Sequence, residues 1–111
     1  MKKLLAALLF VPAMAHAEFW TGNDLYGKLQ SVEVYDRMHG LGYVMGTYDA
    51  QVHVYYCQKS ENLLNAGQLS DIVFQYLSTN PGQRHRPAYA LIMESFKALW
   101  PCGNRAPSRG A

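Results

Sequence analysis

Two cysteines constrain the fold of this chain more than any other feature of its sequence. Cys57 and Cys102 are the only cysteines among its 111 residues, and a bond between them closes a loop of about 45 residues, which stabilises a fold by ~3–4 kcal/mol in the chain-entropy treatment. That gain is comparable with the whole net stability of a small domain. A catalytic thiol and a metal site are the alternatives, but the sequence has no CxxC motif, and zinc needs two further ligands. We therefore predict a disulfide, which requires an oxidising compartment.

The N-terminus has the pattern of a cleavable signal peptide. Lys2 and Lys3 form a short positive region, residues 4–11 are apolar, and residues 15–17 (AHA) match the small-x-small site of signal peptidase. The apolar run is shorter than the ~20 residues that cross a bilayer, and no cysteine follows the cleavage site to carry a lipid anchor. A buried N-terminal helix is the alternative, but two lysines and an Ala-His-Ala end disfavour it. We predict an exported, periplasmic protein with no membrane association after cleavage.

The sequence predicts three parts of the chain. We expect a signal peptide over residues 1–17, one small domain over 18–102, and a disordered tail rich in glycine, proline and arginine over 103–111. The formal charge of the whole chain is +2, and loss of Lys2 and Lys3 brings the charge of the mature chain to zero. A neutral domain gives no reason to expect nucleic acid or an anionic membrane as a partner.

Apolar residues recur at steps of three and four, which predicts an all-α domain of four helices. The first runs from a cap at Thr21 or Asn23 to Gln30, and the second from about Tyr35 to Tyr56. The third opens at Gly67 and ends before Pro81, and the fourth runs from Pro87 to Pro101. The disulfide would then join the ends of the second and fourth helices. The expected apolar stripes of the last three helices are Met38, Leu41, Met45, Tyr48, Val52 and Tyr55; Leu69, Ile72, Val73, Tyr76 and Leu77; and Ala88, Leu91, Ile92, Ser95, Phe96 and Leu99.

Two features of the second helix complicate this prediction. Residues 51–56 (QVHVYY) alternate polar and apolar side chains and are β-branched, so a strand is the alternative there. A lone strand has nothing to pair with, and a helix is favoured. Gly40, Gly42 and Gly46 each lower helix propensity by ~1 kcal/mol relative to alanine. We expect them on a flank where another backbone comes close.

No pattern of side chains predicts catalysis, a metal or a cofactor. His39 and His53 on one helix would lie ~21 Å apart along its axis, too far to share a metal. His39, Asp49 and Ser70 make a triad on paper only, and no nucleophile, zinc-protease or nucleotide-binding motif is present. We therefore expect a protein that works by binding rather than as an enzyme.

Two sets of residues stand out as surface candidates. Arg84, His85 and Arg86 are the densest local charge, and they suit either the C-terminus of the preceding helix or an anion-binding loop. The tyrosines that fall off the predicted stripes are candidates for exposure and for contact with a partner, since exposed tyrosine is rigid and amphipathic. They are Tyr35, Tyr43, Tyr56 and Tyr89.

Taken in order, seven blocks of this sequence resemble the Rap1a/Tai immunity family over Thr21 to Cys102. The blocks are residues 21–26 (TGNDLY), 40–50 (GLGYVMGTYDA), 56–57 (YC), 66–73 (AGQLSDIV), 76–77 (YL), 80–88 (NPGQRHRPA) and 99–102 (LWPC). Many relatives carry a further cysteine pair between the first two helices. Leu29 and Gly40 occupy the corresponding positions here.

The resemblance implies a function. Family members with known roles neutralise peptidoglycan amidase effectors that type VI secretion systems deliver into the periplasm. The implied partner is therefore a cognate amidase effector, whose active site the protein occludes, with a homodimer as the implied assembly and no cofactor. We place the partner-binding residues in residues 59–65 and 83–86, adjoining Cys57 and the third helix, at Lys59, Glu61, Asn62, Gln83, Arg84 and Arg86.

Two other classes of function fit the same features. A small periplasmic chaperone or stress protein would also be helical and disulfide-linked. A cell-wall-binding module would use exposed tyrosine and tryptophan. Either would be an orphan periplasmic binding protein without a cognate toxin.

Overall fold

The structure, a computed structural model, describes residues 19–59 and 63–103. These residues form four α-helices, the 3-10 turn η3 (Pro81–Gln83), and no β-strand. The helices are α1 (Gly22–Leu29), α2 (Val34–Gln51), α3 (Ala66–Thr79) and α4 (Ala88–Leu99). The predicted all-α class is confirmed, as is the Cys57–Cys102 disulfide. The predicted signal peptide, residues 1–17, lies outside the described residues, and so does the predicted tail beyond Gly103.

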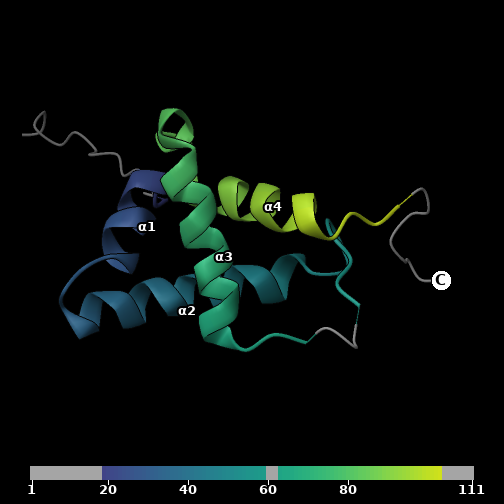
Figure 1. Ribbon diagram of the computed structural model, residues 1–111, viewed down its shortest axis with the longest axis horizontal. Helices are drawn as coiled ribbons and strands as arrows, with labels where there is room; N and C mark the ends of the chain where they lie inside the picture. Colours follow the sequence, from purple (N-terminus) through teal and green to yellow (C-terminus); the bar gives the residue numbers. More distant parts are fainter. Residues whose placement is uncertain (1–18, 60–62, 104–111) are drawn as a thin grey trace, which may run out of the picture.

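The helices pack around one core rather than as an up-and-down bundle. In Figure 1, α2 and α4 run in a similar direction across the view, α3 crosses α2 and passes beside the start of α4, and α1 lies near the N-terminal end of α2. Every helix contributes buried apolar side chains, and so does Tyr56 from the segment after α2. The core residues are Leu25, Val44, Tyr56, Leu69, Val73, Leu77, Ala88, Leu91, Ile92 and Phe96.

Capping boxes fix the starts of α1 and α3. The Thr21 hydroxyl accepts from the Asp24 N–H at 3.2 Å, while the Asp24 carboxylate accepts from the Thr21 N–H at 2.9 Å. Asn65 and Gln68 make the same reciprocal pair at 2.8 and 2.9 Å. Each box satisfies two N–H groups that the first helical turn leaves unpaired. Of the two predicted caps for α1, Thr21 is therefore the one used.

The predicted second helix is wrong at its end. α2 stops at Gln51, and the Gln51 carbonyl accepts from the N–H groups of both Val54 and Tyr55 at 2.9 Å. The chain then reverses, with His53 at φ 68° and its N–H donating to the Tyr56 carbonyl at 2.6 Å. Residues 52–56 are thus a tight turn, neither helix nor strand, and the reversal is what carries Tyr56 into the core.

The predicted stripe of α2 is also only partly right. The buried residues of α2 are Gly40, Val44 and Gln51, none of which is in that stripe. Leu41, Met45, Tyr48 and Val52 are half-buried, and Met38 and Tyr55 are exposed. At Gly40 α1 does come close, but through side chains rather than its backbone: a Cβ there would lie 2.8 Å from Leu29 Cδ2 and 3.2 Å from Lys28 Cβ. A Cβ at Gly42 or Gly46 would meet no atom within 4 Å, so the expectation is wrong at those two positions.

An aromatic cluster lies beside the disulfide, at the ends of α2 and α4. Phe96 stacks on Tyr56 and on Trp100, with centroid distances of 5.3 Å in both pairs, and Tyr48 meets Phe96 edge to face at 5.4 Å. Tyr56, expected at the surface, is completely buried. Leu99, expected on the buried face of α4, is half exposed, because the chain leaves the helix there.

Candidate functional site

Of Lys59, Glu61 and Asn62, the contact residues predicted in segment 59–65, the structure describes only Lys59. Its side chain is exposed, and it borders a depression of about 400 Å³ with Cys57, Leu99, Trp100 and Pro101. The Cys57 N–H donates to the Trp100 carbonyl at 2.8 Å, so the disulfide and a backbone bond both hold this segment. Glu61 and Asn62, the other candidates in the segment, lie outside the described residues.

Arg84 is held by the fold itself. Its Nη1 donates to the Leu77 carbonyl at 2.9 Å, near the C-terminus of α3, and its guanidinium lies over the ring of Tyr26, 4.0 Å from the centroid. Its Nε is buried with no hydrogen-bond partner in the described part of the chain. The main chain is engaged as well, because the Arg84 and Arg86 carbonyls accept from the Asn23 and Gly22 N–H groups, both at 2.8 Å.

Arg86 makes the best-defined ion pair of the described residues. Its Nη2 lies 2.5 Å from Glu94 Oε2, and its Nη1 donates to Glu94 Oε1 at 3.1 Å and to Gln83 Oε1 at 3.0 Å. The hydrogen bond from Arg86 lowers the pKa of Glu94. The Tyr76 hydroxyl also donates to Glu94, at 3.0 Å, and its pKa is raised by burial first and by that bond second.

The predicted contact residues do not form one site. Gln83, Arg84 and Arg86 precede α4, whereas Lys59 lies beside the residues that follow it. The 12 residues of α4 separate the two groups by ~18 Å. Gln83 and Lys59 are exposed, so each end of α4 offers one candidate that is accessible to a partner.

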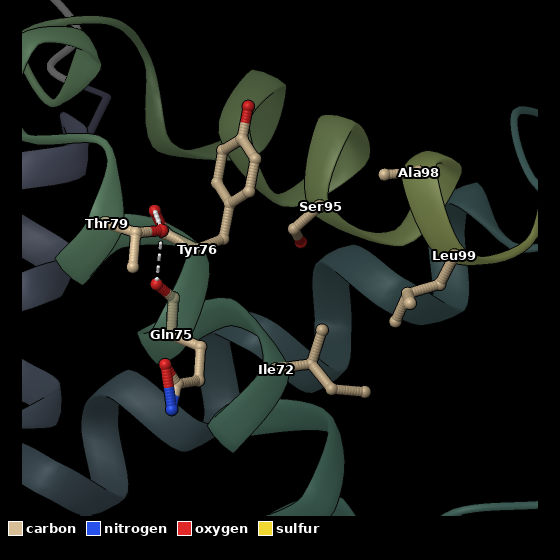
Figure 2. A pocket seen from close by; sticks show the side chains of 7 residues that line it. All are labelled: Ile72, Gln75, Tyr76, Thr79, Ser95, Ala98 and Leu99. Carbon is tan, nitrogen blue, oxygen red and sulfur yellow. Dashed lines mark hydrogen bonds between the residues drawn. The ribbon is translucent and has the colours of Figure 1, made fainter.

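An apolar groove lies between α3 and α4. It has a volume of about 370 Å³, and Figure 2 shows its lining side chains projecting from the two helices. The Ser95 hydroxyl donates to the Ile92 carbonyl at 2.8 Å, so it is already paired. The groove suits an apolar side chain of a partner rather than chemistry. It is lined by Ile72, Gln75, Tyr76 and Thr79 of α3 and by Ser95, Ala98 and Leu99 of α4.

Exposed apolar side chains gather in two further places, and of these side chains the sequence patterns predicted only Tyr35. One is the start of α2, and the other is the turn after it, where Val54 and Tyr55 are exposed. The spacing of three and four placed Val52 and Tyr55 on a buried helix face. The alternating, β-branched residues 51–56 were therefore the only sign in the sequence that the helix ends early. At the start of α2 the exposed side chains are Val32, Val34, Tyr35 and Met38.

The tyrosines expected at the surface are divided. Tyr35 and Tyr89 are exposed, and Tyr89 meets Phe19 edge to face with centroids 6.1 Å apart. Tyr43 is half-buried and stacks on Trp20 at 4.7 Å, and Tyr56 is in the core. Of the four tyrosines expected at the surface, Tyr35 and Tyr89 are therefore the exposed ones, near the starts of α2 and α4.

Histidines and acidic residues do not gather into a metal site in residues 19–59 and 63–103, where no group of three or more His, Cys, Asp or Glu is close enough to hold an ion. His53 lies beyond α2, so it and His39 do not share a helix. In the same residues no helix combines the length and the apolar character needed to cross a membrane.

Comparison with known proteins identifies the family. A search of curated proteins returned no match. Among protein families, the Rap1a immunity proteins match residues 21–102. The match spans α1 to Cys102 and so contains every helix described above. It confirms the resemblance drawn from the seven sequence blocks, and the chain belongs to the Rap1a immunity protein family.

Proposed function

We propose that this protein is a periplasmic immunity protein that binds a peptidoglycan amidase effector of a type VI secretion system and blocks its active site. The observation that carries the proposal is the family match over residues 21–102, which covers the whole helical domain. An immunity protein acts on a toxin that has been delivered to its own compartment. The signal peptide proposed for residues 1–17 supplies that location.

The geometry supports a binding role. A protein that inhibits by contact benefits from a surface held in one conformation, because less entropy is lost on binding. Here the disulfide, the aromatic cluster and two capping boxes hold the ends of the helices. Tyr35, Tyr55 and Tyr89 are exposed, and tyrosine is a residue type that anchors protein interfaces.

The proposal includes the processing and the assembly of the chain. Signal peptidase would cleave before Glu18, and residues 18–102 would form the active domain. Inhibition would proceed by binding, without catalysis or a cofactor. We propose a homodimer as the working assembly.

The test is co-expression of the full-length chain with a panel of amidase toxins directed to the periplasm. Survival of the cells and co-purification of a stable complex are the expected results. A chain lacking residues 1–17 is the matched control and should not protect. Failure of the full-length chain to protect against every toxin, together with its capture by purified peptidoglycan, would contradict the proposal and favour a cell-wall-binding protein.

A further inference from the structure

The turn after α2 presents apolar side chains that nothing in the fold uses. His53, Val54 and Tyr55 are consecutive and exposed, between half-buried Val52 and fully buried Tyr56. Val54 is 54% exposed and Tyr55 51%, although valine and tyrosine are large residues whose burial is favourable. Their exposure at the tip of a turn contrasts with the burial of the residues on either side.

The base of this turn is firmly held. The Tyr56 hydroxyl donates to the buried Gln51 side chain at 2.9 Å, and the Gln51 amide donates to the Tyr89 carbonyl at 3.0 Å. Tyr48 donates to Gln58 on the other side of the turn. Cys57 follows directly and is bonded to Cys102. A side chain at the tip is thus presented from a fixed base rather than from a mobile loop.

The backbone of the turn is also unfavourable for its sequence. His53 has φ 68°, the only positive φ of a non-glycine residue in the described ranges. Such a conformation is costly for residues other than glycine, and it persists only where the surrounding structure enforces it. The reversal at His53 is what separates exposed Tyr55 from buried Tyr56, and it sets the direction of the tip.

We infer that the turn His53–Tyr55 is the principal contact of this protein with its toxin, with Val54 and Tyr55 inserted into a concave apolar recess of the toxin. The inference rests on the proposed function and names the surface that performs it. An enzyme that cleaves a cross-linked polymer has an open cleft, and a narrow convex turn fits a cleft better than a flat helix face does. Tyrosine in such a recess is a common anchor of protein interfaces.

The side chains at the tip indicate the chemistry of the recess that would receive them. Its three side chains carry no carboxylate and no permanent positive charge, so the recess needs an apolar wall and a polar atom for the Tyr55 hydroxyl rather than a complementary charge. The exposed residues Val34, Tyr35 and Met38 are equally apolar, but they lie at the other end of α2. The 18-residue helix is ~27 Å long, so Val34 and Tyr35 lie nearly a whole helix length from its C-terminal end.

That separation supplies a matched control. Tyr55→Ala and Val54→Ser each remove apolar surface at the tip, and Tyr35→Ala removes a tyrosine that is still more exposed, at the far end of α2. The probe is an amidase that the wild-type chain neutralises in the co-expression panel, purified and titrated by calorimetry. We expect Tyr55→Ala to weaken binding about thirtyfold or more, Val54→Ser to weaken it by a smaller factor of at least about fivefold, and Tyr35→Ala to stay within about twofold of the wild type. Thermal unfolding midpoints and disulfide mapping establish that every variant is folded.

The outcomes separate the two proposals. Wild-type protection with equal binding by all folded variants would overturn the role of the turn and leave the immunity function in place. Loss of binding by Tyr35→Ala alone would overturn it in favour of the start of α2. A change from dimer to monomer in the tip variants, with toxin binding retained, would make the turn a contact between copies and overturn it too. Failure of the wild type against every amidase would overturn both.

Discussion

Arg84 illustrates how a charged residue singled out in a sequence can serve the fold. Its guanidinium donates to the last turn of α3 and stacks on Tyr26 of α1. Replacing it with alanine removes a charge-assisted hydrogen bond and a cation–π contact. We expect Arg84→Ala to lower the free energy of unfolding by about 2–3 kcal/mol, measured by urea titration.

Lys59 is the natural comparison for Arg84. It is exposed, and Lys59→Ala should change the free energy of unfolding by less than about 0.5 kcal/mol. Equal stability of Arg84→Ala and wild type would contradict the structural role and return Arg84 to the list of partner contacts.

Glu94 connects the stability of the protein to pH. Its pKa is lowered from the ordinary value of 4.5, chiefly by the hydrogen bond from Arg86. A lowered pKa in the folded state stabilises the protein at pH values above the ordinary pKa, and this stabilisation disappears as pH falls through the folded-state pKa. Because the pair is about one-third exposed, Glu94→Gln should cost only about 0.5–1 kcal/mol at neutral pH.

The difference between wild type and Glu94→Gln should vanish in acid, as followed by urea unfolding from pH 7 down to pH 3. Arg86→Gln should give a similar loss at neutral pH, and the double variant should lose little more, since both changes remove the same interaction. Additive losses would show that the two residues act separately.

The sequence indicated which residues are unusual more readily than it indicated what those residues contact. Arg84 and Arg86 were correctly singled out as unusual, but local sequence cannot reveal that Tyr26 and Glu94 lie against them. Tyr56 was expected to be exposed because burial was deduced from a helical period that ends before it. The exposed Val54 and Tyr55 were hidden by the same assumption.

At the level of elements, Gly22 and Gly42 show why glycines in helices are not equivalent. A Cβ at Gly22 would lie 2.5 Å from Leu91 Cδ1 and 2.9 Å from the Arg84 carbonyl oxygen, whereas one at Gly42 would meet nothing within 4 Å. We expect Gly22→Ala to destabilise the protein by about 1–3 kcal/mol through forced displacement of α1.

Gly42→Ala should instead stabilise the protein by about 0.5–1 kcal/mol, because alanine loses less conformational entropy in a helix. Thermal unfolding midpoints of the two variants should therefore move in opposite directions from that of the wild type. A midpoint shift of the same sign in both would contradict the assigned packing.

Element boundaries were predicted well where local chemistry sets them. The Thr21 capping box and the Asn80–Pro81 end of α3 depend on side chains a few residues apart, and both are in place. The end of α2 depends on where Tyr56 packs, against Phe96 of α4. That long-range contact overrides a periodicity that continues along the chain, so sequence patterns alone extend the helix too far.

For the molecule as a whole, the disulfide is the strongest single constraint. Replacing both Cys57 and Cys102 with serine should lower the free energy of unfolding by ~3–4 kcal/mol, because the unfolded chain regains the freedom of a loop of about 45 residues. Urea titration of the double variant and of reduced wild-type protein should agree. A loss below about 1 kcal/mol in both would show that packing alone holds the two ends together.

The class of fold followed from the sequence, whereas the crossing of α3 over α2 did not. Helix number comes from periodicity and turn residues, which are local. The crossing depends on which faces meet, and the exposed positions Met38 and Leu99 lie on faces that periodicity assigned to the core.

The bonds between the start of α1 and residues 84–88 affect how the chain reaches its final state. The Gly22 and Asn23 N–H groups donate to the Arg86 and Arg84 carbonyls, and the Ala88 N–H donates to the Trp20 carbonyl at 2.8 Å. A chain that crosses a membrane N-terminus first cannot make these bonds until residue 88 has emerged. In the export proposed above, α1 would therefore lack these partners until residues 84–88 had followed it across the membrane.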